Sequence, residues 1–298
     1  MKEDKQQIAA RQLRLVTYLS IGANVLLIAG KFLVGYITSS LSLLADGVHS
    51  VSDMVTDLAV LLGLYLGSKK PDSSHQYGHG KLETLAAVAI ALSLFGVGLG
   101  MIYYAALAIT KDQVTRPRNL VLVAAIGAIA VKEVVYRLTK TVAIKHHCAA
   151  ALANAWHDRA DALSSLAVIA GVVAHKFGFN HGDQVAAIAV GIMVVVVAAR
   201  ITADSFGELT ERAVDHAIID QIKDIIKANG QIRQYHRLRT RTVGREVFLD
   251  LHILVDRNLN VAAAHQIAQN LEDTLDEQLT RPVNITVHIE PDIPALRE

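Results

Sequence analysis

Two pairs of histidine and aspartate stand at the same spacing inside long apolar stretches of the sequence. His49 precedes Asp53 by four residues, and His157 precedes Asp161 by four. Residues four apart share one face of an α-helix, so two such helices can direct two imidazole nitrogens and two carboxylate oxygens at one ion. Four such ligands in a tetrahedron suit Zn²⁺. Ionisable side chains at membrane depth cost about 2.5–3.5 kcal/mol each, so the repeated pair predicts a metal site rather than polar contacts between helices alone.

Three more aspartates, Asp46, Asp57 and Asp158, lie in the same two stretches. Four ligands already complete a tetrahedral site. We therefore expect these three carboxylates to support the ligands from outside or to face water.

A second group of possible ligands lies in the polar segment that follows the first pair. Asp72, His75 and His79 are ligand types at close spacing, within the sequence Pro-Asp-Ser-Ser-His-Gln-Tyr-Gly-His-Gly-Lys. Histidines also occur in polar loops without any ligand. The spacing therefore leaves a metal site and an ordinary solvated loop as open alternatives.

A third group lies in the last quarter of the chain and comprises His236, His252, His265, His288 and Glu290. Strand-like alternation places His288 and Glu290 together on the face turned away from the core. Single surface histidines carry no meaning, but several near one sheet edge can form a metal-binding surface. Both readings stay open at this point.

Six apolar stretches must position these residues. Spanning a bilayer as a helix takes roughly 20 predominantly apolar residues, and the candidates are 15–37, 41–66, 84–109, 120–136, 149–174 and 185–201. The chain is 52% hydrophobic and 19% charged, and 26 of its charged residues lie in the last 91 positions. We therefore expect a short N-terminal tail over 1–14, a six-helix transmembrane domain over 15–207 and a soluble domain over 208–298.

Lysines and arginines indicate the orientation of these spans. The N-terminal segment and the loops after the second and fourth stretches carry ten of them, against four in the opposite connections. The positive-inside rule then places both termini in the cytoplasm, and the segment 1–14 does not resemble a cleavable signal peptide. A net charge of +1 gives no reason to expect nucleic acid as a partner, and the single cysteine excludes an intrachain disulfide or a cysteine-based zinc finger.

The C-terminal segment reads as a small α+β domain. Helical spacing over 215–228 ends before Asn-Gly, and strand-like segments over 235–243 and 246–255 flank a Gly-Arg turn. A helix over 261–279 and an alternating strand over 283–289 follow. The order αββαβ predicts a ferredoxin-like or metallochaperone-like sandwich, with two helices on one side of a three-stranded sheet.

Together these features resemble the cation diffusion facilitator family. The resemblance rests on the two His-x-x-x-Asp pairs, on Tyr-Gly-His-Gly-Lys at 77–81, on Leu-Ala-Asp-Gly-Val-His-Ser at 44–50 and on Trp-His-Asp-Arg-Ala-Asp-Ala-Leu-Ser-Ser at 156–165. It implies a homodimeric exporter that exchanges cytoplasmic divalent metal for protons. By the same resemblance His49, Asp53, His157 and Asp161 form the transport site, the second group is a loop site, and the third is a cytoplasmic site at the dimer interface. Lys81 resembles a lysine that pairs with an acidic residue after the sixth span, here Glu211.

Histidine at both pair positions favours zinc, with cadmium and cobalt as further substrates, because imidazole suits zinc and the later first-row metals. The loop and cytoplasmic sites then hold Zn²⁺ in a structural or regulatory role. Segments similar to the magnetosome branch keep iron open, and manganese is the remaining alternative within the family. A membrane metal sensor that binds without transport is the alternative of another class. The chain lacks the His-Glu-x-x-His motif of a membrane zinc protease, so we expect no enzyme, but an integral protein of the inner membrane.

Overall fold

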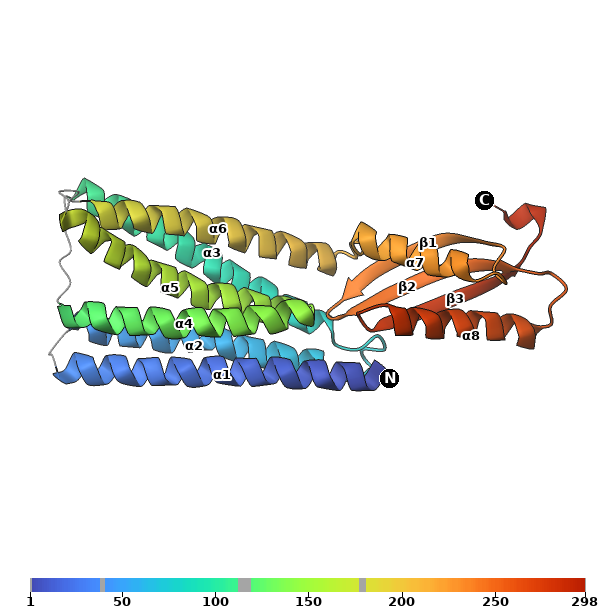
Figure 1. Cartoon of the computed structure of the whole chain (residues 1–298), viewed down its shortest axis with the longest axis horizontal. Helices are drawn as coiled ribbons and strands as arrows, with labels where there is room; N and C mark the ends of the chain where they lie inside the picture. Colours follow the sequence, from blue (N-terminus) through green and yellow to red (C-terminus); the bar gives the residue numbers. More distant parts are fainter. Residues whose placement is uncertain (1, 38–40, 112–118, 177–180, 298) are drawn as a thin grey trace. The chain divides into compact units, whose positions relative to one another are not determined.

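The computed structural model describes residues 2–37, 41–111, 119–176 and 181–297 (Figure 1). This part of the chain divides into two compact units. The first comprises Ala9–Phe206, and the second comprises Gly207–Glu298 together with Met1–Ile8. Each unit is described by itself below.

Six long helices form the first unit, as the apolar stretches predict. They are α1 (Lys2–Ile37), α2 (Leu41–Gly67), α3 (Lys81–Thr110), α4 (Asn119–Lys145), α5 (Ala149–Lys176) and α6 (Gly182–Leu209). By length and hydropathy, α1, α3 and α6 contain segments that can cross a membrane, at Gln7–Val34, Lys81–Thr110 and Gln184–Leu209. The other three helices carry charged residues that lower their mean hydropathy. The six expected helices are therefore confirmed, but only three of them are uniformly apolar among the described residues.

The first helix differs from the expected separate tail over 1–14. It begins at Lys2 and continues without a break into the apolar stretch, because the polar segment consists mainly of good helix formers. Its Leu13 is fully buried among Val60 and Leu64 of α2, and Arg14 donates to the Ser68 hydroxyl at 3.2 Å. The turns of α1 that contain Leu13 and Arg14 are therefore part of the helical bundle.

Small residues let the helices approach closely. The first turns of α5 are rich in alanine, and Ala150, Ala151 and Ala153 are completely buried against their neighbours. A Cβ added at Gly98 of α3 would lie 3.1 Å from the carbonyl oxygen of Gly191 in α6. In a membrane such close backbone contact replaces the hydrophobic drive that packs helices in water.

The second unit confirms the αββαβ order. Its elements are α7 (His216–Ala228), β1 (Gln234–Val243), β2 (Glu246–Val255), α8 (Val261–Gln278), β3 (Val283–Pro291) and a 3₁₀ turn, Pro294–Leu296. The sheet order is β1-β2-β3, with β1 and β2 antiparallel and β2 and β3 parallel. Gly244 joins β1 to β2 with φ of 58°, a left-handed conformation that glycine adopts without strain.

The core of this unit lies between the sheet and its two helices. Alternate residues of β2, Leu249, Leu251 and Ile253, are completely or almost completely buried with Ile222 of α7 and Leu271 of α8. The residues between them in β2 point to the opposite face of the sheet. This alternation leaves the outer face free to carry polar side chains, as the sequence predicts.

Candidate metal sites

One half of the expected transport site is described on α5. His157 is buried, with 4% of its surface exposed, and Asp161 lies one turn further along the same helix. The other half, His49 and Asp53, stands at the same spacing on α2, but its side chains lie outside the described residues. The joining of all four ligands around one ion therefore stays a prediction.

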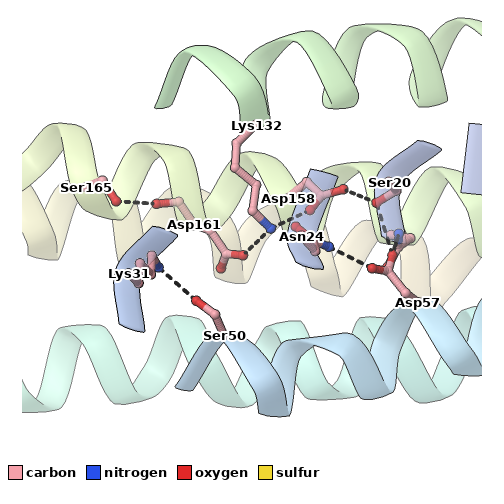
Figure 2. Close-up of polar contacts among 10 residues, drawn as sticks. Ser20, Asn24, Lys31, Ser50, Asp57, Lys132, Asp158, Asp161 and Ser165 are labelled. Carbon is pink, nitrogen blue, oxygen red and sulfur yellow. Dashed lines mark hydrogen bonds and ion pairs between the residues drawn. The ribbon is translucent and has the colours of Figure 1, made fainter. Parts of the chain in front are cut away.

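Lys132 of α4 binds to the described half of this site (Figure 2). Its ammonium lies 2.6 Å from Asp158 Oδ1 and 3.1 Å from Asp161 Oδ2. The sequence reading missed this residue, although a lysine at the end of an apolar run was a visible signal. Its partners lie on a different helix and could not be read from spacing along the chain.

Asp57 of α2 is held by three donors from two other helices (Figure 2), an arrangement that we call the Asp57 network. Ser20 and Asn154 donate to its Oδ1 at 3.1 and 2.6 Å, and Asn24 donates to its Oδ2 at 2.6 Å. The Ser20 hydroxyl also lies 3.2 Å from Asp158 Oδ2. Both aspartates are about 1% exposed, so they support the polar centre of the bundle rather than face water.

A small cavity adjoins these polar groups. Its volume is about 90 Å³, and it is lined by residues of α1, α2, α4 and α5 that include Asn24, Lys132, Asp161 and Ser165. Lys31 of α1 reaches the same cavity and donates to the hydroxyl of Ser50, the residue after His49 in α2, at 2.8 Å. The described polar centre therefore contains two lysines as well as carboxylates.

The loop between α2 and α3 brings together Asp72, His75 and His79, which we call the loop cluster. One potential ligand atom of each residue lies within 4.8 Å of those of the other two, and His79 Nε2 is 3.4 Å from Asp72 Oδ2. The backbone N–H groups of His75 and Ser74 donate to Asp72 Oδ1 at 2.7 and 2.9 Å. The bond from His75 lowers the pKa of the Asp72 carboxyl below its usual value. An ionised carboxylate beside two imidazoles is a donor set that Zn²⁺ accepts.

The outer face of the sheet carries the other set, His236, His252, His288 and Glu290, which we call the sheet cluster. The strand register pairs His236 with His252 and His252 with His288, so one histidine from each strand forms a row across the sheet. Glu290 lies beside this row, with its carboxylate oxygens 2.9 Å from His236 Nε2 and 2.8 Å from His252 Nδ1. His288 Nε2 is 3.5 Å from the same carboxylate. The expected residues of β1, β2 and β3 are thus together in one chain.

The charge of Glu290 follows from these neighbours. Burial alone would raise the pKa of its carboxyl, but the hydrogen bonds to His252 and His236 lower the pKa below its usual value. His265 is exposed on α8 and is not among the described residues of this cluster. A carboxylate with two or three imidazoles is again a set that suits zinc.

The expected pair of Lys81 and Glu211 is not tested, because the two residues belong to different units of the structure. Within its own unit, Glu211 accepts a hydrogen bond from Arg241 Nη1 at 2.9 Å. Glu211 has φ of 64°, the left-handed region that non-glycine residues seldom occupy. The pairing of Lys81 with Glu211 stays a prediction.

Comparisons with known proteins cover both units. Residues 17–210 match the model of the cation efflux transmembrane domain, and residues 214–292 match that of the cation efflux protein cytoplasmic domain. An uncharacterized transporter, MJ0449 of Methanocaldococcus jannaschii, is 33% identical over 91% of this chain and 96% of its own. Magnetosome protein MamB of Magnetospira sp. is 30% identical over 88% of this chain and 89% of its own.

Two further proteins are similar to this chain. The manganese efflux system protein MneP of Bacillus subtilis is 28% identical over 98% of this chain and 99% of its own. A solved structure of a putative zinc transporter, CzrB, covers 27% of this chain and 99% of that chain, at 26% identity and a TM-score of 0.26. Since the first family model covers well over half of the sequence, the chain belongs to the cation diffusion facilitators, integral membrane transporters of divalent metal cations with a cytoplasmic dimerisation domain, and is not an enzyme.

Proposed function

We propose that this transporter exports Zn²⁺ from the cytoplasm in exchange for protons, with Cd²⁺ and Co²⁺ as further substrates. The observation that carries the proposal is the pair of the buried His157 and the partly buried Asp161 on α5, at the spacing that His49 and Asp53 repeat on α2. Two imidazoles and two carboxylates form a set that favours zinc over manganese and magnesium, which prefer oxygen ligands. The protein works as a homodimer in the inner membrane, with both termini in the cytoplasm.

Proton exchange follows from the same ligands. A histidine binds metal through its neutral imidazole and an aspartate through its ionised carboxylate, so protons and metal compete for one set of atoms. Protons that arrive from the release side displace the ion, and protons must leave before the next ion binds. A carrier of this kind is driven by a pH gradient, whereas a facilitator driven by the metal gradient alone is not.

Manganese and iron are the second candidates, because relatives of similar identity are named for manganese efflux and for the magnetosome. A metal sensor that does not transport is the candidate of another class. The loop and sheet clusters alone would be enough for a sensor. Ionisable groups at membrane depth would then cost free energy of insertion without contributing to its function. The two clusters support a structural or regulatory Zn²⁺ in addition to the transported ion.

Metal uptake into proteoliposomes that contain the full chain tests these candidates. We expect zinc, cadmium and cobalt to enter faster than iron and manganese, and Asp161→Asn to abolish uptake because it removes one anionic ligand. Asp220→Asn is the matched control, since Asp220 is exposed on α7 and pairs with Lys223 there. Uptake by Asp161→Asn at the wild-type rate would show that the assigned transport site is wrong.

A pH gradient at equal zinc on both sides tests the exchange. We expect net zinc movement toward the acidic side, because protons on that side displace the bound ion. Wild-type vesicles that carry zinc down a metal gradient but show no net movement here would refute proton exchange while leaving the transport of zinc intact.

A further inference from the structure

The ammonium of Lys132 contacts two carboxylates, that of Asp158, which supports the site, and that of Asp161, which is a proposed metal ligand. Its side chain is 12% exposed, and the side chains of Asp158 and Asp161 are 1% and 23% exposed. The shorter contact, 2.6 Å, goes to Asp158, and the longer one, 3.1 Å, goes to Asp161 (Figure 2). One lysine thus binds a supporting carboxylate firmly and a proposed metal ligand more loosely.

The loose contact conflicts with metal binding. Asp161 Oδ2 accepts a hydrogen bond from the ammonium, and a divalent ion at that carboxylate would lie within a few ångströms of a like charge. Coulomb repulsion at such a distance is strong wherever water does not screen it. The ammonium and the metal ion therefore compete for the negative charge of Asp161.

We propose that Lys132 is a tethered cation that occupies Asp161 while the carrier is empty and that the transported metal ion displaces it. This inference rests on the proposed transport site and adds a residue that competes with the cargo. The competition weakens metal binding, and it helps release because a cation already attached to the protein takes the place of the departing ion. It also leaves the empty site with less uncompensated negative charge in a medium where such charge is costly.

The surroundings of Lys132 allow this exchange. Asp158 binds the ammonium through Oδ1, and its other oxygen lies 3.2 Å from the Ser20 hydroxyl. The lysine can therefore leave Asp161 and keep one partner. The cavity of about 90 Å³ that Lys132 lines is also lined by Ser164, Ser165 and Asp161. The displaced ammonium thus has both a remaining ion pair and polar surroundings.

A simpler role for Lys132 is to neutralise Asp158 permanently and to hold α4 against α5. In that role, removal of the charge weakens the fold and does not strengthen metal binding. If Lys132 competes with the metal ion, removal of its charge strengthens metal binding instead. Equilibrium affinity for metal therefore separates the two roles.

The measurement uses the purified full chain in which the other two clusters are disabled by His79→Ala and His252→Ala. Zinc is titrated in competition with a chelator of known affinity. We expect Lys132→Gln to bind zinc about ten- to a hundredfold more tightly, the range that corresponds to one lost charged hydrogen bond at the competing carboxylate. Lys132→Arg keeps the positive charge, so its zinc affinity should stay closer to that of the parent than the affinity of Lys132→Gln does. Lys140→Gln is the control on the same helix, since Lys140 contacts the Tyr136 hydroxyl at 3.0 Å.

Transport kinetics provide a second readout that a merely structural lysine would not give. In proteoliposomes, Lys132→Gln should lower KM together with kcat, because tighter binding slows release. A raised KM or an unchanged zinc affinity in the folded variant would overturn the proposal. If Lys132→Gln is too unstable without metal, saturating zinc must raise its Tm more than it raises that of the parent, and an equal or smaller rise also overturns the proposal.

Asp161→Asn separates this inference from the proposed function. If Asp161→Asn alone leaves zinc affinity unchanged, the assigned transport site itself is wrong. If it weakens binding while Lys132→Gln does not strengthen it, only the tethered cation is refuted. In the combined variant the gain from Lys132→Gln should disappear, because the lysine then has no metal-ligating carboxylate to block.

Discussion

Replacement of Asp57 by alanine should destabilise the helical bundle measurably. The substitution leaves the side-chain amides of Asn24 and Asn154 without this acceptor, whereas the Ser20 hydroxyl keeps Asp158 Oδ2 at 3.2 Å. Asp57 itself is 1% exposed, so water does not replace it. An orphaned buried donor costs about 1–3 kcal/mol. Hydrogen bonds inside membranes lie at the low end of such values, so we expect a loss of about 2 kcal/mol for the two amide donors, or about 4–8 °C in Tm.

The assay is thermal unfolding of the detergent-solubilised chain in the presence of a chelator. The single tryptophan, Trp156, reports on the bundle because its ring lies 5.6 Å from that of Tyr136, between α5 and α4. Asp57→Asn is the matched control, since it keeps one carbonyl acceptor and should lose about 1 kcal/mol. A Tm for Asp57→Ala within about 2 °C of the wild type would refute the stabilising role of the Asp57 network.

Three further predictions concern metal choice and the two clusters. His49→Asp should raise manganese or iron transport relative to zinc, because a hard oxygen replaces a nitrogen ligand, and an unchanged rank order in a competition assay would contradict this. Glu290→Gln should lower the stability of the metal-free C-terminal domain, which has a core of its own. Because the pKa of Glu290 is lowered from its usual value of 4.5, its ionised carboxylate stabilises the fold above pH 4.5, and this stabilisation is lost as the pH falls through the lowered pKa. The difference in urea midpoint between wild type and variant should therefore shrink on acidification. Asp72→Asn should weaken zinc binding at the loop cluster at least about tenfold, measured in a chain that carries His157→Ala and His252→Ala; unchanged affinity would show that the loop cluster does not bind zinc.

The alternation of β2 was sufficient to predict much of the C-terminal domain. Because a strand has a period of two, Leu249, Leu251 and Ile253 define the buried face, and His252 must then lie on the other face. The row of His236, His252 and His288 also needs the strand register, which includes an irregularity between His236 and Arg239. Side-chain type therefore indicated the four residues of the sheet cluster together with His265, which lies outside it, and the distances within the cluster depended on the fold.

The helical domain was less predictable at its polar centre. Spacing identifies residues that share a face of one helix, so His157 and Asp161 could be paired from the sequence. Lys132 could not be assigned to Asp158 and Asp161, because that contact depends on how α4 packs against α5. The criterion of apolar length gives no helix over residues 2–14, which belong to α1 because of their helix propensity.

The placement of the sheet cluster has a consequence for the order in which the domain folds. Its ligands come from all three strands, and the last of them, His288 and Glu290, lie on β3, which pairs in parallel with β2 only after the α8 crossover. Parallel pairing across a helix has a large sequence separation and forms late. A metal ion that requires all these ligands therefore binds only chains whose synthesis has passed residue 290 and whose sheet has closed. Its binding free energy adds to the native state alone, so cytoplasmic zinc would act as a selective stabiliser of completed copies.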